Sequence, residues 1–200
     1  DEIARLTRKP IAIHIMDDWP KTISKPGLFQ KYWENKIDKE FRSLLDKTKI
    51  FLSISEGMSR EYLKRYNKTF IPFHNPVAID RWLPFSKNDY SIKNNQINIL
   101  YSGRIGIGTS ESQLEIVTAV KSLTNLGYNI VYHIQTANPT DDIFEKLRNN
   151  SCVIINNPVD YHELPKVYSE ADILILPVDF NSYAQKFLKL GNDTALKDIM

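Results

Sequence analysis

Short apolar runs of strand length alternate with longer amphipathic segments along most of the chain. The apolar runs predict strands at residues 10–16, 50–54, 69–73, 97–101, 129–135, 152–155 and 172–176. Apolar residues at helical spacing predict helices at 31–47, 62–66, 111–126 and 141–149, and a further helix from about residue 160. Such alternation is typical of βαβ units and parallel sheets, so the pattern predicts an α/β protein.

The pattern is interrupted at residues 80–95, a polar segment with one proline and no clear period. Segments of this kind often link domains. A chain of 200 residues is long enough for two small α/β domains, each with its own core. We therefore expect two lobes, residues 1–90 and residues 91–200, joined near residue 90.

Composition and charge exclude several classes of protein. The net charge is +2, from 26 basic and 24 acidic residues, so no basic excess indicates nucleic-acid binding. The single cysteine, Cys152, cannot form an internal disulfide, and the four histidines show no metal-ligand spacing, so no metal is expected. No apolar run reaches the length of about 20 residues that a membrane-spanning helix needs. These features predict a cytoplasmic protein.

The segment after the predicted strand at 97–101 concentrates glycine around one arginine. Gly103, Gly106 and Gly108 flank Arg104 in a chain with only 7 glycines. Parallel sheets bind ligands beyond the carboxyl ends of their strands, where bare backbone and an arginine fork suit phosphate oxygens. Ser110-x-x-Gln113 predicts a capping box at the start of the next helix. The loop is either an anion site or a glycine-rich turn with a solvated arginine.

Two adjacent acids, Asp17 and Asp18, follow the first predicted strand. A magnesium-binding phospho-receiver site also begins with paired acids, but Ser53 and His74 lie where its further acid and lysine would be. The sequence contains no Asp-x-Asp, the usual signature of a metal–diphosphate site. The acid pair therefore either caps a loop or has a catalytic role.

Several segments together resemble one family, the retaining nucleotide-sugar glycosyltransferases with the GT-B fold (glycosyltransferase group 1, family 4-like). ILYSGRIG and HELPKVYSEADILILPV resemble its second domain, in which the first strand ends in Gly-Arg, here Gly103-Arg104. PIAIHIMDDWP, SISEGMSREYLKRY and FIPFHNPVAI resemble successive strand and turn segments of its first domain. The resemblance covers most of the chain from Pro10 to about Val178.

The resemblance implies two Rossmann-like lobes, both incomplete, and metal-independent retaining transfer without a cofactor. The donor would be a nucleotide diphosphate sugar and the acceptor a saccharide or lipid-linked molecule, in bacterial polysaccharide synthesis. The donor would contact Ser102, Gly103, Arg104, Gly106, Gly108, Thr109 and Ser110, with Val159 and Leu164 bordering the base. Asp17 and Asp18 would face the acceptor as catalytic groups.

The chain also departs from this family. Glu111 lies where the family has a phosphate-binding lysine, and Met16 where it has a histidine. The segments expected after Pro177 are absent, so either the sequence is truncated or residues are missing between about Leu190 and Gly191, and we expect the second. Two alternatives therefore stay open: a non-catalytic glycosyltransferase-like binding or scaffold protein, and a sugar-nucleotide epimerase.

The predicted helix at 31–47 has an apolar stripe beside four cationic side chains, those of Lys31, Lys36, Lys39 and Arg42. Such a stripe either packs on its own sheet or contacts an anionic membrane surface. The second interpretation would place the protein peripherally at the inner face of the cell membrane.

Overall fold

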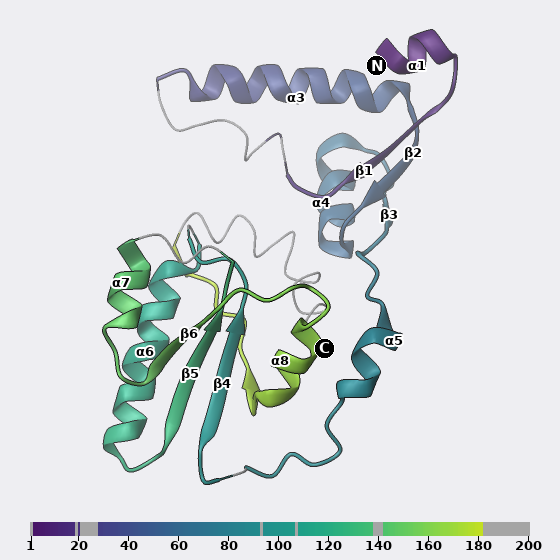
Figure 1. Ribbon diagram of the computed structural model, residues 1–200. Helices are drawn as coiled ribbons and strands as arrows, with labels where there is room; N and C mark the ends of the chain where they lie inside the picture. Colours follow the sequence, from purple (N-terminus) through teal and green to yellow (C-terminus); the bar gives the residue numbers. More distant parts are fainter. Residues whose placement is uncertain are drawn as a thin grey trace. The chain divides into compact units, whose positions relative to one another are not determined.

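The computed structural model describes residues 2–18, 20, 28–92, 94–106, 108–137 and 142–181. These residues form two compact units that divide after Pro76 (Figure 1). All strand pairs in both units are parallel, which confirms the predicted α/β class. Residues 77–90, assigned to the first lobe by the sequence pattern, group with the second unit. The break expected at Leu190–Gly191 lies outside the described residues.

The first unit contains a three-stranded sheet in the order β1-β2-β3. Its strands are β1 (Ile11–Ile15), β2 (Thr48–Ser53) and β3 (Ile71–Pro72), and its helices are α1 (Glu2–Thr7), α3 (Gln30–Lys47) and α4 (Glu56–Tyr66). The helix α3 connects β1 to β2, and α4 connects β2 to β3, as parallel pairing requires. The strands and α3 lie where the sequence pattern predicts them.

The helix α4 begins six residues earlier than predicted. Ser55 is its N-cap, and the Ser55 hydroxyl accepts a hydrogen bond from the N–H of Met58. Asn67 ends the helix in the left-handed conformation, with φ of 53°. The prediction was wrong because Gly57 indicated a turn, whereas a serine cap and buried Met58, Tyr62 and Tyr66 outweigh the low helix propensity of one glycine.

Aromatic rings dominate the core of the first unit. The buried residues are Phe41, Leu45, Ile54, Met58, Tyr62, Tyr66 and Phe70. The ring of Tyr62 lies 5.2 Å from those of both Tyr66 and Phe70, in edge-to-face geometry. Each such contact adds about 0.5–1.5 kcal/mol to the stabilisation from burial. This core packs α4 against β2 and β3.

The second unit contains a four-stranded sheet in the order β6-β5-β4-β7. Its strands are β4 (Ile97–Ser102), β5 (Ile130–Gln135), β6 (Val153–Asn156) and β7 (Ile173–Leu174). The helices α6 (Ser110–Asn125) and α7 (Asp142–Arg148) lie on one face of the sheet, and α8 (Leu164–Glu170) lies on the other (Figure 1). The chain leaves β4 toward β5 and β6 and then returns to the other side of β4, which creates a topological switch point beside this strand.

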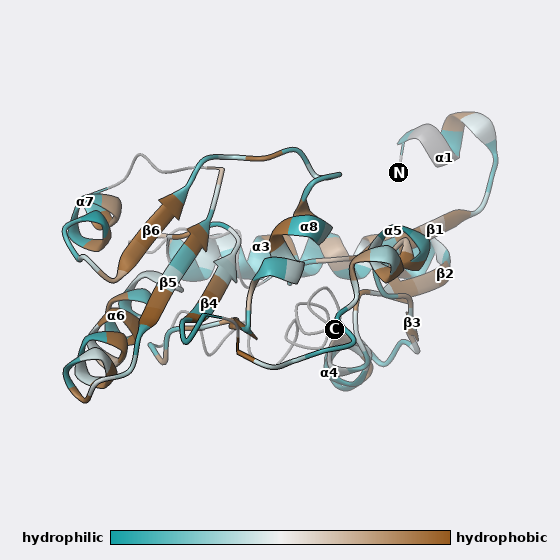
Figure 2. Ribbon diagram, turned by 60° about the horizontal axis from the view of Figure 1, so that its bottom comes forward, coloured by the Kyte–Doolittle hydropathy of each residue, from teal (hydrophilic) through white to brown (hydrophobic). Residues whose placement is uncertain are grey.

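Burial of apolar side chains explains why these segments form strands and helices that pack together. Figure 2 shows hydrophobic stretches in β5 and β6 and both colours on α6 and α7. The core includes the fully buried side chains of Tyr132, Ile134 and Leu147. Gly127 follows α6 with φ of 96°, as predicted for a glycine that ends a helix.

The predicted linker at residues 80–95 is partly helical. It contains most of α5 (Ile79–Trp82) and all of the short helix η1 (Leu83–Phe85). The Trp82 ring packs 5.2 Å from that of Tyr168 on α8, and the Arg81 guanidinium lies 5.1 Å from the ring centre of Tyr161. These aromatic contacts explain why the segment orders against the second unit despite its polar composition.

Buried tyrosines make the protein sensitive to high pH. Burial raises the pKa of Tyr62, Tyr66 and Tyr132 above the ordinary value of 10.0, and the Asp18 and Asp38 carboxylates raise those of Tyr62 and Tyr66 further. The unfolded chain therefore loses these protons at lower pH than the folded chain. We expect the free energy of unfolding to be unaffected by these groups well below pH 10 and to fall as the pH rises above about 10. Urea unfolding between pH 8 and pH 11 measures this, and an unchanged midpoint would contradict it.

Candidate functional site

A cavity of about 460 Å³ lies at the carboxyl ends of β4, β5 and β6 in the second unit. It is lined by Ser102, Gly103, Arg104, Gln135, Thr136, Ala137, Pro158, Val159 and Leu164. Five of these were predicted site residues: Ser102, Gly103, Arg104, Val159 and Leu164. The structure brings them together because the carboxyl ends of parallel strands meet at one edge of a sheet. The cavity also lies beside the switch point of the sheet.

Hydrogen bonds connect the three strand ends below the cavity. The Gly103 N–H donates to the carbonyl oxygen of Gln135 at 3.0 Å. The Gln135 side-chain amide donates to the carbonyl oxygen of Asn157 at 2.9 Å. The segments after β4, β5 and β6 are therefore held in fixed positions relative to one another.

Arg104 is an exposed cation at this cavity. Within the described parts of the chain, its guanidinium forms no ion pair or hydrogen bond, and Glu111, the nearest carboxylate in sequence, does not pair with it. Its backbone is fixed, because the Tyr101 hydroxyl donates to the Arg104 carbonyl oxygen at 2.7 Å. The side chain can therefore bind an anion without first breaking an internal ion pair.

The Tyr101 side chain leaves little room for a side chain at position 103, whereas position 106 has room for one. A Cβ at Gly103 would lie 3.0 Å from the Tyr101 hydroxyl oxygen, and the φ of 158° disfavours a side chain. A Cβ at Gly106 would meet nothing within 4 Å. The close packing at Gly103 is therefore contact within the chain, and the prediction that the glycines of this loop give a ligand close access to the backbone stays a prediction.

This contrast gives a matched pair of substitutions. We expect Gly103→Ala to displace the Tyr101 hydroxyl from the Arg104 carbonyl and to lower the free energy of unfolding by about 1–3 kcal/mol. Gly106→Ala should change it by less than about 0.5 kcal/mol. Urea unfolding of both variants tests this, and equal midpoints would show that the Tyr101 contact does not constrain the loop.

The start of α6 differs from the predicted capping box. The N-cap is Thr109, which makes no side-chain cap. The Ser110 hydroxyl donates to the Gly106 carbonyl at 2.8 Å, and the Gln113 side chain accepts a hydrogen bond from the Tyr132 hydroxyl. The capping-box prediction is wrong because both side chains have other partners. Gly106, Thr109 and Ser110 form this turn and do not line the cavity.

A carboxylate that sequence reasoning missed occupies the start of α6. Asp179, 2% exposed, accepts the Ser112 N–H at 2.8 Å, and its own N–H donates to the Gly108 carbonyl at 2.8 Å. A negative charge is favourable at a helix N-terminus, so the chain supplies its own anion there. The only signal in the sequence was an acid placed just after the apolar run at 173–178. Gly108 therefore supports Asp179 and does not line the cavity.

The acid pair of the first unit is divided between two environments. Asp17 is exposed, whereas Asp18 is 7% exposed. Both carboxylate oxygens of Asp18 accept from the Arg65 guanidinium at 2.9 Å, and the Tyr62 hydroxyl donates to the same carboxylate at 3.0 Å. This geometry makes Asp18 a structural ion-pair partner, which corrects the expectation that it faces an acceptor. Asp17 is left as the acidic candidate at this position.

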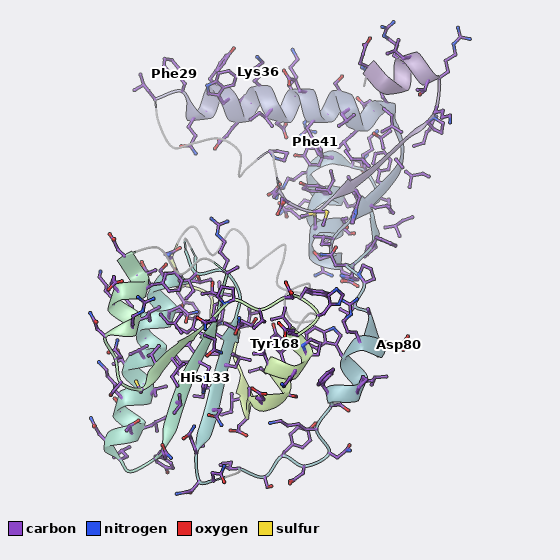
Figure 3. The ribbon with its side chains drawn as sticks, viewed as in Figure 1. Phe29, Lys36, Phe41, Asp80, His133 and Tyr168 are labelled. Carbon is purple, nitrogen blue, oxygen red and sulfur yellow. The ribbon has the colours of Figure 1, made fainter. Side chains whose placement is uncertain are left out.

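The histidines inside strands have hydrogen-bond partners, as predicted, but both are half-buried and neither belongs to a core, where they were expected. His14 lies 3.1 Å from the Phe73 carbonyl oxygen. His133 (Figure 3) lies on the face of the sheet toward α8, with its ring nitrogens 3.3 Å from Asn98 Oδ1 and 3.5 Å from Asn156 Oδ1. It borders a second cavity of about 260 Å³. Among the described residues, no group of three or more His, Cys, Asp or Glu side chains could hold a metal ion.

Comparison with known proteins adds one relative. The fold and the cavity together define a class of protein: a parallel α/β unit with a ligand-sized cavity beside the switch point of its sheet. No protein-family model matches the chain. A Klebsiella pneumoniae protein described as "Uncharacterized 41.2 kDa protein in cps region" is 28% identical over 135 residues, which are 66% of this chain and 34% of that protein. The chain thus spans about a third of the length of this relative. In the described part of the chain, no helix has the length and hydropathy needed to cross a membrane.

Proposed function

We propose that the second unit binds a nucleotide diphosphate sugar and that the protein is a GT-B-type glycosyltransferase of polysaccharide biosynthesis. The observation that carries this proposal is the position of Arg104, an unpaired cation among the described residues, beside the bare backbone of Gly103. Among the described residues, no carboxylate forms an ion pair with Arg104. A phosphate group is the ligand that an arginine fork and a glycine backbone accommodate best.

The cavity changes from charged to apolar across the sheet. Arg104 follows β4, and the side chains of Pro158, Val159 and Leu164 lie beyond β6. Neighbouring strands are about 4.8 Å apart, so these two ends are separated by about 10 Å. A nucleoside diphosphate has the same polarity, with an anionic end and a flat base. The cavity volume of about 460 Å³ also falls in the range usual for small-molecule sites.

In this proposal Arg104 stabilises the charge that develops on the leaving diphosphate. Retention of configuration and independence from metal rest on the family resemblance alone. Asp17, exposed after β1, is the candidate that orients the acceptor or accepts its proton. The relative in a cps region, which we take as a capsular polysaccharide region, supports a role in polysaccharide synthesis.

Calorimetric titration of the full-length protein with uridine, guanosine and adenosine diphosphates tests the binding step. We expect one of them to bind at micromolar to millimolar concentration, and the matching monophosphate to bind more weakly. Transfer is then tested with the sugar donors of that nucleotide and a lipid-linked acceptor. If the folded, full-length protein binds none of the three diphosphates, the proposal fails.

A non-catalytic binding protein is the second candidate, and two carboxylates favour it. Glu111 is exposed in the first turn of α6, where the resembled family has a lysine, and Asp179 is buried beside it. Both would weaken the binding of a second anion near this helix. Hydrolysis or transfer of the donor separates the candidates: nucleotide binding without any turnover in the full-length protein would select the non-catalytic one.

Peripheral membrane association is a related proposal, supported by the start of α3. Leu28, Phe29, Tyr32 and Trp33 are exposed, and the Lys36 ammonium lies 5.2 Å from the Trp33 ring centre. Lys36 and the buried Phe41 extend from opposite sides of the helix (Figure 3). Aromatic and cationic side chains together suit an anionic lipid surface. Sedimentation with vesicles containing 30% anionic lipid, compared with neutral vesicles, tests this, and equal recovery in the supernatant would refute it.

A further inference from the structure

The side chain of Gln135 lies at the centre of the cavity floor. Gln135 is the last residue of β5, is 5% exposed, and lines the cavity. Because β5 is paired with β4 on one side and β6 on the other, Gln135 lies between the strand end that carries Arg104 and the strand end that leads to Val159. Any ligand that spans these two ends must pass over it.

The hydrogen bond to Asn157 determines which end of the Gln135 side-chain amide is the nitrogen and which is the oxygen. The Asn157 carbonyl oxygen can only accept a hydrogen bond, so the group 2.9 Å away must be the Nε2 donor of Gln135. The Oε1 acceptor is therefore the other end of the amide. No described residue donates to Oε1, and the backbone carbonyl of Gln135 is already used by Gly103. Gln113, also buried, differs because its Oε1 accepts from Tyr132.

We propose that Gln135 determines ligand specificity in this cavity, with Oε1 accepting a hydrogen bond from an N–H or O–H of the nucleoside part of the ligand. This inference rests on the proposed nucleotide binding. A ligand that fills the cavity removes water from Oε1, and an acceptor that is then left without a donor is costly, so a ligand that supplies a donor gains more than one that does not.

The nucleoside, and not the phosphate, is the part that Gln135 selects. Ionised phosphate oxygens are acceptors only, so they are repelled by Oε1 and attracted to Arg104. The amide cannot rotate to offer Nε2 without losing its bond to Asn157, so it distinguishes a donor from an acceptor at the same place on the ligand. The donors of a nucleoside are the N–H groups of its base and the hydroxyls of its ribose.

The test removes these donors one at a time. The full-length protein is titrated with the nucleoside diphosphate that it binds best, and with the base N-methylated, 2′-deoxy and 3′-deoxy analogues of that compound. We expect one analogue to bind roughly tenfold more weakly to the natural protein, the effect of one neutral hydrogen bond. In Gln135→Met, which keeps the size of the side chain and removes the acceptor, this difference should disappear. Gln96→Met, at the opposite end of β4, is the matched control and should keep it.

The outcomes separate this inference from the proposed function. If no nucleoside diphosphate binds the natural protein, the proposed function fails. If the diphosphate binds but no analogue differs from it, or if Gln135→Met keeps the difference, only the role of Gln135 is refuted. Gln135→Asn, which shortens the side chain by one methylene and so moves the acceptor away from the ligand, is measured in parallel. It replaces Gln135→Met in the test if circular dichroism shows that Gln135→Met does not fold.

Discussion

Replacing Asp18 with alanine is expected to lower the free energy of unfolding by about 3–5 kcal/mol. The side chains of Arg65 and Asp18 are only 14% and 7% exposed, and two parallel hydrogen bonds of 2.9 Å join them. Removal of the carboxylate leaves a largely buried guanidinium with Glu61, at 2.6 Å, as its remaining carboxylate partner among the described residues, and deprives the Tyr62 hydroxyl of its acceptor. Urea unfolding of the first unit, followed by circular dichroism, measures the loss.

The neighbouring acid provides the control for this prediction. Asp17→Ala removes the same charge from an exposed position and should change the free energy of unfolding by less than about 0.5 kcal/mol. Asp18→Asn keeps an acceptor for Tyr62 but loses the charge that pairs with Arg65, so its effect should be intermediate. Equal unfolding midpoints for Asp17→Ala and Asp18→Ala would show that the ion pair contributes nothing, and the structural role of Asp18 would have to be abandoned.

Replacing Arg104 with alanine is expected to weaken binding of the nucleoside diphosphate by about ten- to a hundredfold, with folding nearly intact. A charge-assisted contact to phosphate contributes roughly 1.5–3 kcal/mol, which gives this range. Stability should change little because the Arg104 side chain is exposed and forms no ion pair within the described residues. Titration calorimetry gives the affinity, and thermal unfolding gives the stability.

Two further substitutions test the geometry of this contact. Arg104→Lys should recover only part of the affinity, because an ammonium cannot reproduce a two-pronged bond to phosphate. Arg148→Ala removes the same charge from the far end of α7 in the same unit and should leave the affinity unchanged. If Arg104→Ala and Arg148→Ala bind the nucleotide equally well, Arg104 has no part in the site.

Local patterns predicted most elements of the fold, because they depend on residues close in sequence. The spacing of Trp33, Ile37, Phe41 and Leu45 gives α3 to within a residue. The same patterns failed at α4 and at Ile79–Phe85, where a serine cap and contacts to α8 decide the structure. The first of these could have been found from Ser55, but the second depends on a ring 86 positions away in sequence, the distance from Trp82 to Tyr168.

The grouping of candidate site residues around one cavity was predictable where topology alone brings residues together. Ser102–Arg104 and Val159 follow parallel strands, and the rule for carboxyl ends places them at one edge. The partners of Asp18 and of the α6 start could not be predicted, because Arg65 and Asp179 lie 47 and 67 residues away from the groups that they bind. The spacing of nearby residues cannot reveal such pairings, and each of them gives a structural contact to a residue predicted for the site, Asp18 as a catalytic group and Gly108 as a donor contact.

The pairing of β4 with β7 has a consequence for synthesis of the protein. Asn98 and Asp172, which begin this pairing, are separated by 74 residues, whereas the neighbour on the other side, β5, follows after one helix. At a translation rate of about 5–20 residues per second, the ribosome needs roughly 4–15 s to synthesise the residues between β4 and β7. During this time one edge of β4 has no strand to pair with. An open edge can pair with another nascent chain. Codons that slow translation between β4 and β7 would lengthen this interval and should reduce the yield of folded protein.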